Sequence, residues 1–259
     1  MTDAARRDGR QPGETRPLEI TFPGLARVDG SAKFSFGDAG ALASVSGPIE
    51  VRLAAELPSK ATFEVMVRPL SNVPGTDSKS LATTIRSSLE PSLILTKSPR
   101  SLVQLVIQTL SPSHTVYGKD ALSAAMINAG SLALLKEGSV PMKGVVTAVA
   151  VGRLPLGTLV LDPSEEEAET VQGGGVFAFF FADALPTGDC VWTGWKSTSG
   201  KYNEKEMLQA RELARVGAKG VYMAMRWGFT AQSVKQEVLS QPGAVEVKED
   251  SDAEDKMEI

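Results

Sequence analysis

The sequence predicts an α+β fold in which mixed sheets are joined by crossover helices. Three observations indicate this class. Short segments of alternating apolar and polar residues recur along the chain, and the near-continuous apolar run at 101–110 is typical of a central strand. Two further stretches carry apolar residues at helical spacing. The connections between these segments are short and no short repeat is present, which favours one mixed α+β domain.

The first third of the chain is predicted to be mostly strand. Pro17 favours an edge position for the first segment. The stretch RVDGSAKFSFGDAGALASVSGPIEV at 27–51 predicts a hairpin closed by the glycine turn at 37–40. Gly47-Pro48 is predicted to turn the chain into a further strand, with another turn at Pro58. The expected strands are 16–21, 34–36, 41–46, 49–53 and 61–67.

The remainder is predicted to alternate between helices and strands. A helix at 78–89 carries apolar residues at every fourth place, with Asp77 as a possible cap. Asp120 is expected to cap a helix at 121–136 that stops at Gly138 and whose small residues allow close packing on a sheet. A last helix begins near 204. The expected strands are 101–110, 143–151, 157–161, 175–182 and 190–197.

The composition excludes several kinds of site and several classes of protein. The chain carries a formal net charge of -4, with a single cysteine and a single histidine. One cysteine excludes an intramolecular disulfide and a cysteine-rich metal cluster, and His114 in a loop is more typical of a solvated side chain than of a catalytic base. The absence of a long apolar run predicts a soluble intracellular protein. We expect a flexible segment at 1–15, a domain at 16–232 and an acidic, disordered tail at 233–259.

Several motifs occur together in a recognisable order. They are RRDGR, RPL, the hairpin at 27–51, IRSSLEP, SLVQLVIQTL, AAMINAGSLAL, GTLVLDP and STSGKYNEKE. In this order and spacing the chain resembles RNase PH-like proteins over nearly its whole length except the tail. The resemblance implies an RNase PH fold (ribosomal protein S5 domain 2-like) and, for exosome members, a place in a six-subunit ring.

The resemblance also implies partners and locations. The partners would be other RNase PH-like ring subunits, S1/KH cap subunits and single-stranded RNA threaded through the central channel. It implies no membrane association and no cofactor, and it places the protein in the nucleus, nucleolus and cytoplasm. Active members of the family are phosphorolytic: inorganic phosphate attacks the 3′-terminal phosphodiester and nucleoside diphosphates leave.

The phosphate-binding positions of active members are altered here. Counting back from the SLAL motif places the family's phosphate cradle on Ala121, Leu122, Ser123 and Ala124, with Ser123 at the arginine position. A helix N-terminus and one hydroxyl would remain, but the guanidinium that binds phosphate is missing. We therefore expect a degenerate phosphate site.

The family's paired carboxylates are also incomplete. Their positions fall near Ala168 and Gly174, where the first has acidic neighbours at 165–167 and 169 and the second has none. A shift of one residue would place Glu167 at the first position. The preferred interpretation of this acidic run is a solvated, flexible loop, and the alternative is a metal site. No metal is expected, and Asp162 is expected to form a turn.

The basic residues expected to guide RNA by its phosphates are scattered along the first hundred residues. An alternative is that some are surface or interface charges. The aromatic residues at 177–181, with Trp192 and Trp195, are expected in the core or at an interface, because stacking platforms need exposed rings beside basic groups. The RNA-binding candidates are Arg68, Lys79, Arg86, Lys97 and Arg100.

These observations favour a non-catalytic structural subunit of the exosome core ring. It would support 3′-to-5′ RNA processing and degradation, including rRNA processing and mRNA turnover, by scaffolding the ring and lining its channel. The first alternative is a residually active 3′-to-5′ exoribonuclease, either phosphorolytic or metal-dependent, using Glu167 or Glu169. The second alternative is a free-standing RNA-binding homodimer.

Overall fold

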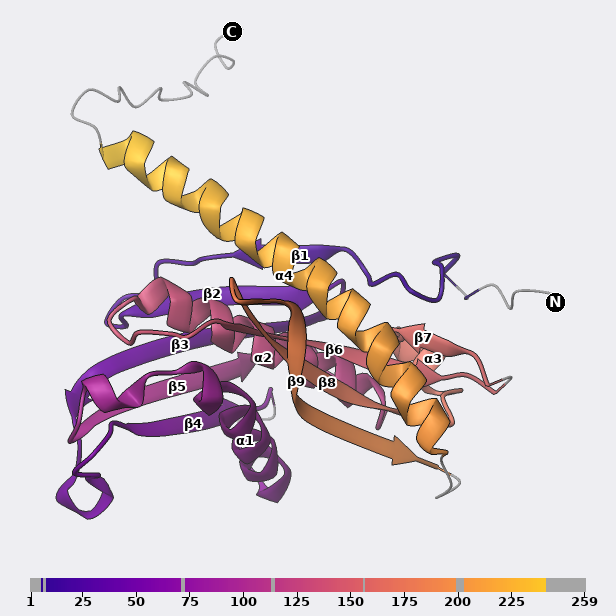
Figure 1. Cartoon of the computed structure of the whole chain (residues 1–259), viewed down its shortest axis with the longest axis horizontal. Coiled ribbons are helices and arrows are strands. Elements are labelled where there is room, and N and C mark those ends of the chain that lie inside the picture. The colour runs from indigo at the N-terminus through magenta and orange to yellow at the C-terminus, as the bar shows by residue number, and fades with distance from the viewer. Residues whose placement is uncertain are drawn as a thin grey trace, which may run out of the picture.

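Two sheets with a helix buried between them form the body of the molecule, and a second long helix lies outside (Figure 1). The computed structural model describes residues 6, 8–70, 73–112, 115–155, 157–198 and 203–240. No helix among these residues has both the length and the apolar character that crossing a membrane requires. The predicted α+β class with mixed sheets and crossover helices is confirmed.

The first sheet has the order β1-β2-β3-β5-β4. Its strands are β1 (Leu18–Thr21), β2 (Gly30–Phe36), β3 (Ala39–Glu50), β5 (Ser101–Thr109) and β4 (Thr62–Arg68). The predicted hairpin is β2 and β3, with Phe34 opposite Ala41. β5 lies inside the sheet between β3 and β4, which confirms the central strand predicted from its apolar run. β4 runs parallel to β5, so the chain between them crosses over through helices.

The predicted turn at Gly47-Pro48 is wrong. β3 continues through these two residues to Glu50, and its pairing with β5 shifts between Ser46 and Ile49 as in a β-bulge. Proline has no N–H to donate to the ladder, and a bulge accommodates it within the strand. The strand expected at 49–53 is correspondingly absent beyond Glu50, where a short 3₁₀ helix, η1 (Leu53–Ala55), follows.

Helix α2 (Gly118–Glu137) lies between the two sheets. It contacts β2 and β3 on one side and β6 (Val145–Arg153) and β8 (Gly173–Ala182) on the other. Its small residues let it approach closely, as predicted: a Cβ added to Gly30 of β2 would overlap the backbone of α2 at Ala133. The Asn128 side chain donates to the Ala148 carbonyl at 2.9 Å and accepts from its N–H at 2.7 Å. Gly138 ends the helix with a positive φ, which also confirms the prediction.

The second sheet has the order β7-β6-β8-β9. α4 (Glu204–Ser240) covers its outer face, where a row of small and apolar residues is buried: Ala210, Ala214, Ala218, Val221 and Met225. Beyond this row Gly228 packs against Ile20 of β1 and Phe229 against Phe22, and the end of α4 then projects past the sheets (Figure 1). The helix continues to Ser240, eight residues past the domain boundary predicted at 232. The strands are β7 (Leu159–Leu161), β6 (Val145–Arg153), β8 (Gly173–Ala182) and β9 (Leu185–Ser197).

The remaining helices are shorter. α1 (Thr76–Leu89) packs on β4 and α2 through Ile85 and Leu89, and it is followed by the 3₁₀ turns η2 (Glu90–Ser92) and η3 (Leu95–Lys97). Asp77 lies in the first turn of α1 and does not cap it, because the N-cap position is Gly75. α3 (Glu165–Ala168) forms where the sequence predicted a flexible acidic loop.

Candidate functional site

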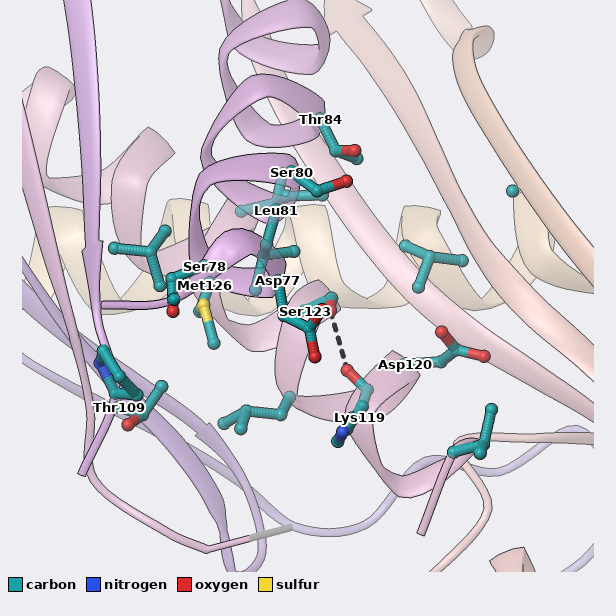
Figure 2. A pocket seen from close by; sticks show the side chains of 18 of the residues that line it. Asp77, Ser78, Ser80, Leu81, Thr84, Thr109, Lys119, Asp120, Ser123 and Met126 are labelled. Atoms are coloured by element: carbon teal, nitrogen blue, oxygen red, sulfur yellow. Dashed lines mark hydrogen bonds between the residues drawn. The ribbon is translucent and has the colours of Figure 1, made fainter. Parts of the chain in front are cut away.

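A cavity of about 1020 Å³ opens between α1, the start of α2 and strand β9. Figure 2 shows the side chains of α1 on one wall and those of α2 on another. The α1 wall is mostly hydroxyl-bearing, with Ser78, Ser80 and Thr84, and β9 contributes Trp192 and Lys196. The positions predicted for the degenerate phosphate site lie here, since Leu122 and Ser123 line the cavity.

The cradle positions themselves present little that would hold an anion. Ala121 and Ala124 are buried, and Leu122 turns an aliphatic side chain to the cavity. The hydroxyl of Ser123 donates to the carbonyl oxygen of Lys119 at 2.7 Å, within its own helix (Figure 2). Ser123 thus stands where active relatives are expected to carry arginine, and its hydroxyl proton is already used.

The N-terminus of α2 does not supply free amides at these positions. The helix begins at Gly118, one turn earlier than predicted, so Asp120 lies in its first turn and does not cap it. The first-turn donors are satisfied locally: Gly118 N–H donates to Thr115 Oγ1 at 2.9 Å, Lys119 N–H to the Thr115 carbonyl at 3.2 Å, and Asp120 N–H to the Tyr117 carbonyl at 3.1 Å. The expectation that a helix end remains available at 121–124 is wrong, because interior helix amides bond to carbonyls four residues earlier.

A carboxylate of the chain also lies against this helix start. Glu165 of α3 accepts hydrogen bonds from the Thr115 N–H at 3.0 Å and from Thr115 Oγ1 at 3.1 Å. A Cβ added to Gly118 would overlap this carboxylate, so the two groups are in direct contact. Negative charge is favoured at a helix N-terminus, and here an internal side chain supplies it.

Two lysines that the sequence reasoning missed line the cavity. Lys119 is exposed on α2, and Lys196 of β9 places its Nζ 3.0 Å from Asp120 Oδ1. Burial raises the pKa of Asp120, and the attraction of Lys196 offsets this only partly. The other oxygen of Asp120 is buried without a hydrogen-bond partner among the described residues. Strand alternation places Trp192, Gly194 and Lys196 on one face, but only the packing decides that this face meets the cavity.

Glu167, the alternative catalytic carboxylate, lies at a different place and is fully engaged. Its carboxylate is bound side-on by Arg6, with Nε to Oε1 at 3.0 Å and Nη2 to Oε2 at 2.7 Å. It also accepts from the Ser164 N–H, while Ser164 Oγ accepts from the Glu167 N–H, which is a capping box at the start of α3. Burial raises the pKa of Glu167, but the Arg6 and Ser164 hydrogen bonds outweigh it and leave that pKa below its ordinary value.

Asp162 is the second centre of this ion-pair cluster. Arg16 donates to both of its oxygens, from Nε at 2.9 Å and Nη2 at 2.6 Å, and Arg10 lies 3.6 Å away. Asp162 has φ 48°, so it does form the predicted tight bend. These pairs join Arg6 and Arg10 of the N-terminal segment to Glu167 and Asp162. We define the cluster as Arg6, Arg10, Arg16, Asp162 and Glu167.

The acidic run therefore divides into two kinds of residue. Glu165 and Glu167 make the contacts described above, whereas Glu166 and Glu169 are exposed. The flexible-loop interpretation is wrong for Glu165 to Ala168, which form α3. Ala168 is buried, and a Cβ on Gly174 would press against Tyr117 and the backbone of β6. Within the described ranges, no group of three potential metal-ligating side chains is present.

The five RNA-binding candidates do not form one patch. Arg68 ends β4 beside Gln108 of β5, and Lys79 lies in α1, so both are near the cavity end of the first sheet. Lys97 and Arg100 precede β5 at the opposite end, about 30 Å away for a strand of this length. Two of the candidates are paired: Arg86 lies 3.4 Å from Glu90, and Arg100 lies 3.3 Å from Glu56.

The aromatic residues mostly follow the prediction. Phe177, Phe179 and Phe181 are buried in the core, while Trp192 and Trp195 are partly buried. The sequence reasoning did not single out Trp227, which is 75% exposed on α4. His114 lies outside the described residues.

Comparison with known proteins agrees with the architecture. The family model for domain 1 of the 3′ exoribonuclease family (RNase PH) matches residues 14–138. An exosome complex component Rrp41 of Archaeoglobus fulgidus is 34% identical over 236 residues, which cover 87% of this chain and 86% of the relative. An exosome complex exonuclease RRP46 homolog of Arabidopsis thaliana is 34% identical over 191 residues, covering 73% and 77%.

Solved structures show the same fold. The crystal structure of rice (Oryza sativa) Rrp46 superimposes with a TM-score of 0.74 at 26% sequence identity, covering 85% of this chain and 98% of that one. An archaeal exosome core chain gives a TM-score of 0.68 at 18% identity, covering 85% and 91%, which supports the fold alone.

Proposed function

The chain belongs to the RNase PH-like family of exosome ring subunits, and from this premise we propose that it is a non-catalytic structural subunit of that ring. In this role it supports 3′-to-5′ RNA processing and degradation by holding its neighbours and by lining the RNA channel. The rice Rrp46 likeness, which extends over almost the whole of that chain, supports a retained scaffold.

One observation carries the non-catalytic assignment. At the cradle, the arginine position is Ser123, and its hydroxyl is bonded within α2, while the first-turn amides donate to Thr115 and Tyr117 just before the helix. Phosphorolysis requires that the enzyme bind inorganic phosphate next to the scissile bond, which takes several converging donors. Glu165 adds negative charge at the same helix start, which opposes the approach of a phosphate.

We propose that the chain still contacts RNA although it does not cleave it. Lys119 and Lys196 at the cavity, with Arg68 and Lys79 near it, provide positive charge that attracts RNA phosphates independently of sequence. Arg86, Lys97 and Arg100 lie toward the far end of the sheet, and we propose that they serve subunit contacts or solvation more than RNA guidance. The proposed partners are other RNase PH-like ring subunits, S1/KH cap subunits and single-stranded RNA.

The test measures assembly and activity on the same preparation. The chain is co-expressed with other RNase PH-like exosome subunits, and the complex is sized and its stoichiometry determined by mass spectrometry. We expect one copy per ring. The isolated chain is then incubated with a 3′-unstructured RNA, with and without phosphate and Mg²⁺, and we expect no release of nucleotides.

A matched variant separates genuine activity from a contaminant. Lys119→Ala with Lys196→Ala removes the cations of the cavity, while Arg52→Ala with Lys97→Ala removes two charges elsewhere. Nucleotide release that falls only in the first variant contradicts the non-catalytic assignment and favours a residual exoribonuclease. A stable homodimer that does not enter the ring contradicts the scaffold role. Imaging of a fluorescent fusion tests the proposed locations, which are nucleus, nucleolus and cytoplasm.

A further inference from the structure

The outward side of α4 carries two parallel rows of exposed side chains. The apolar row is Val216, Gly220, Met223 and Trp227, spaced by four, three and four residues, so it forms one stripe. Val216 is 59% exposed and Trp227 is 75% exposed, and a Cβ on Gly220 would meet no atom within 4 Å. The stripe is thus bare along three turns of the helix.

The basic row lies beside the apolar row. It consists of Arg211, Arg215, Lys219 and Arg226 on the neighbouring flank of the same helix. Arg215 pairs with Glu212. Among the described side chains, no carboxylate lies within ion-pair distance of Arg211, Lys219 or Arg226. A bare apolar row flanked by unpaired cations fits an acidic segment with apolar side chains.

The segment that follows α4 has this composition. Residues 241–259 contain seven acidic residues against Lys248 and Lys256, and they also include Val245, Val247, Met257 and Ile259. The acidic residues are Glu246, Glu249, Asp250, Asp252, Glu254, Asp255 and Glu258. Its charge is therefore opposite to that of the basic row, and it has apolar side chains to cover the apolar row.

Chain geometry allows this segment to return along the helix. Pro242-Gly243 follows one residue after Ser240, and such a pair disfavours continuation of a helix and permits a bend. The path from Ser240 back to Arg226 is about 21 Å along a helix, and back to Arg215 about 38 Å. Nineteen residues span up to about 60 Å when extended, so the acidic residues reach both ends of the basic row.

We propose that residues 241–259 bind in cis to the outward side of α4, covering Trp227 and pairing with Lys219 and Arg226. Covalent attachment gives the segment an effective concentration in the millimolar range, so modest contacts are sufficient. The tail is then the occupant of the apolar and basic rows of α4. This inference does not depend on the proposed place in the exosome ring.

The experiment follows Trp227 in the full chain and in a chain that ends at Ser240. Trp227→Phe identifies the indole resonance and the fluorescence contribution of this residue. We expect acrylamide quenching of Trp227 to rise at least twofold when the tail is removed, and the difference to vanish in 1 M NaCl, where charges are screened within about 3 Å. Lys219→Glu with Arg226→Glu should reproduce the effect of truncation, whereas the matched reversal Arg52→Glu with Lys97→Glu should not.

Three outcomes would overturn the proposal. Equal quenching of Trp227 in the full and shortened chains would show that the tail leaves the stripe open. Protection that grows with protein concentration would place a second copy on it. Protection that appears only when a single-stranded RNA is added would assign the stripe to base stacking, since Trp227 lies beside Arg226. Circular dichroism of each variant confirms that α4 is still helical.

Discussion

Two charged regions of this molecule, the ion-pair cluster and the cavity, differ in how completely their charged groups are paired. In the cluster, three arginines surround Asp162 and Glu167, and each carboxylate oxygen has a donor within about 3 Å. In the cavity, Asp120 has one paired oxygen and one that has no partner, and Ser123 replaces the expected cation. The charged groups of the cluster are therefore fully paired, whereas the cavity leaves one carboxylate oxygen without a partner.

The difference shows why a list of charged residues does not identify a site. The acidic run and the N-terminal arginines looked solvated and mobile in the sequence, yet they meet and bury one another. Their partners lie more than a hundred residues apart in the chain. The cationic side chains that line the cavity, Lys119 and Lys196, lie in stretches of sequence that did not indicate a site. The following four changes test this contrast, from the largest expected effect to the smallest.

Replacing Arg6 by alanine should reduce the free energy of unfolding by about 3–5 kcal/mol, because it leaves Glu167 buried without its partner. Urea denaturation measures the change. Arg100→Ala is the matched control, since its pair with Glu56 is exposed and should change stability by at most about 1 kcal/mol. Equal effects of the two substitutions would show that the buried cluster has no special structural role.

Glu167→Gln should destabilise the chain at pH 7, and the loss should disappear in acid. The folded-state pKa of Glu167 lies below its ordinary value of 4.5, so its stabilising contribution is present above that value and is lost as the pH falls through the folded-state pKa. Thermal unfolding of both proteins from pH 7 to the lowest pH at which they fold measures this. A stability gap that widens in acid contradicts the assignment.

Asp120→Asn should raise stability at neutral pH by up to about 1 kcal/mol, because a buried charge with one unsatisfied oxygen becomes neutral. The pKa of Asp120 is raised, so the cost of its charged form develops as the pH rises above the ordinary value of 3.8 and is complete above the folded-state pKa. The gain should therefore shrink toward zero below the ordinary value of 3.8. A destabilised variant at pH 7 would mean that the Lys196 pair outweighs the burial.

Ser123→Arg should not restore phosphate binding. It returns a guanidinium to the cavity, but the α2 amides remain bonded to Thr115 and Tyr117, and Glu165 still lies at the helix start. Titration with inorganic phosphate, followed by calorimetry, should give a phosphate affinity that differs less than twofold from that of the unmodified chain. Saturable millimolar binding would instead mean that the cavity lacks only its cation.

The sequence by itself determined most of the order of strands and helices, apart from the strand expected at 49–53 and the unexpected α3, and it also determined the β2–β3 hairpin and the close packing of α2. These features follow from local signals: alternation, glycine turns and small residues at helical spacing. It also pointed to Leu122 and Ser123, which line the cavity. It could not place the start of α2, since the N-cap is Tyr117 and the Gly118 N–H donates to Thr115, which lies outside the apolar pattern.

Only the tertiary structure decided the roles of the charged residues. Arg6 and Glu167 are 161 positions apart, and no local pattern marks either as buried. A charge on a solvated loop and a charge in a satisfied pair have the same sequence signature, because the energy of each depends on desolvation and on partners that the fold brings together. Likewise, the turn expected at Gly47-Pro48 became a bulge because β5 continues the pairing on either side of it.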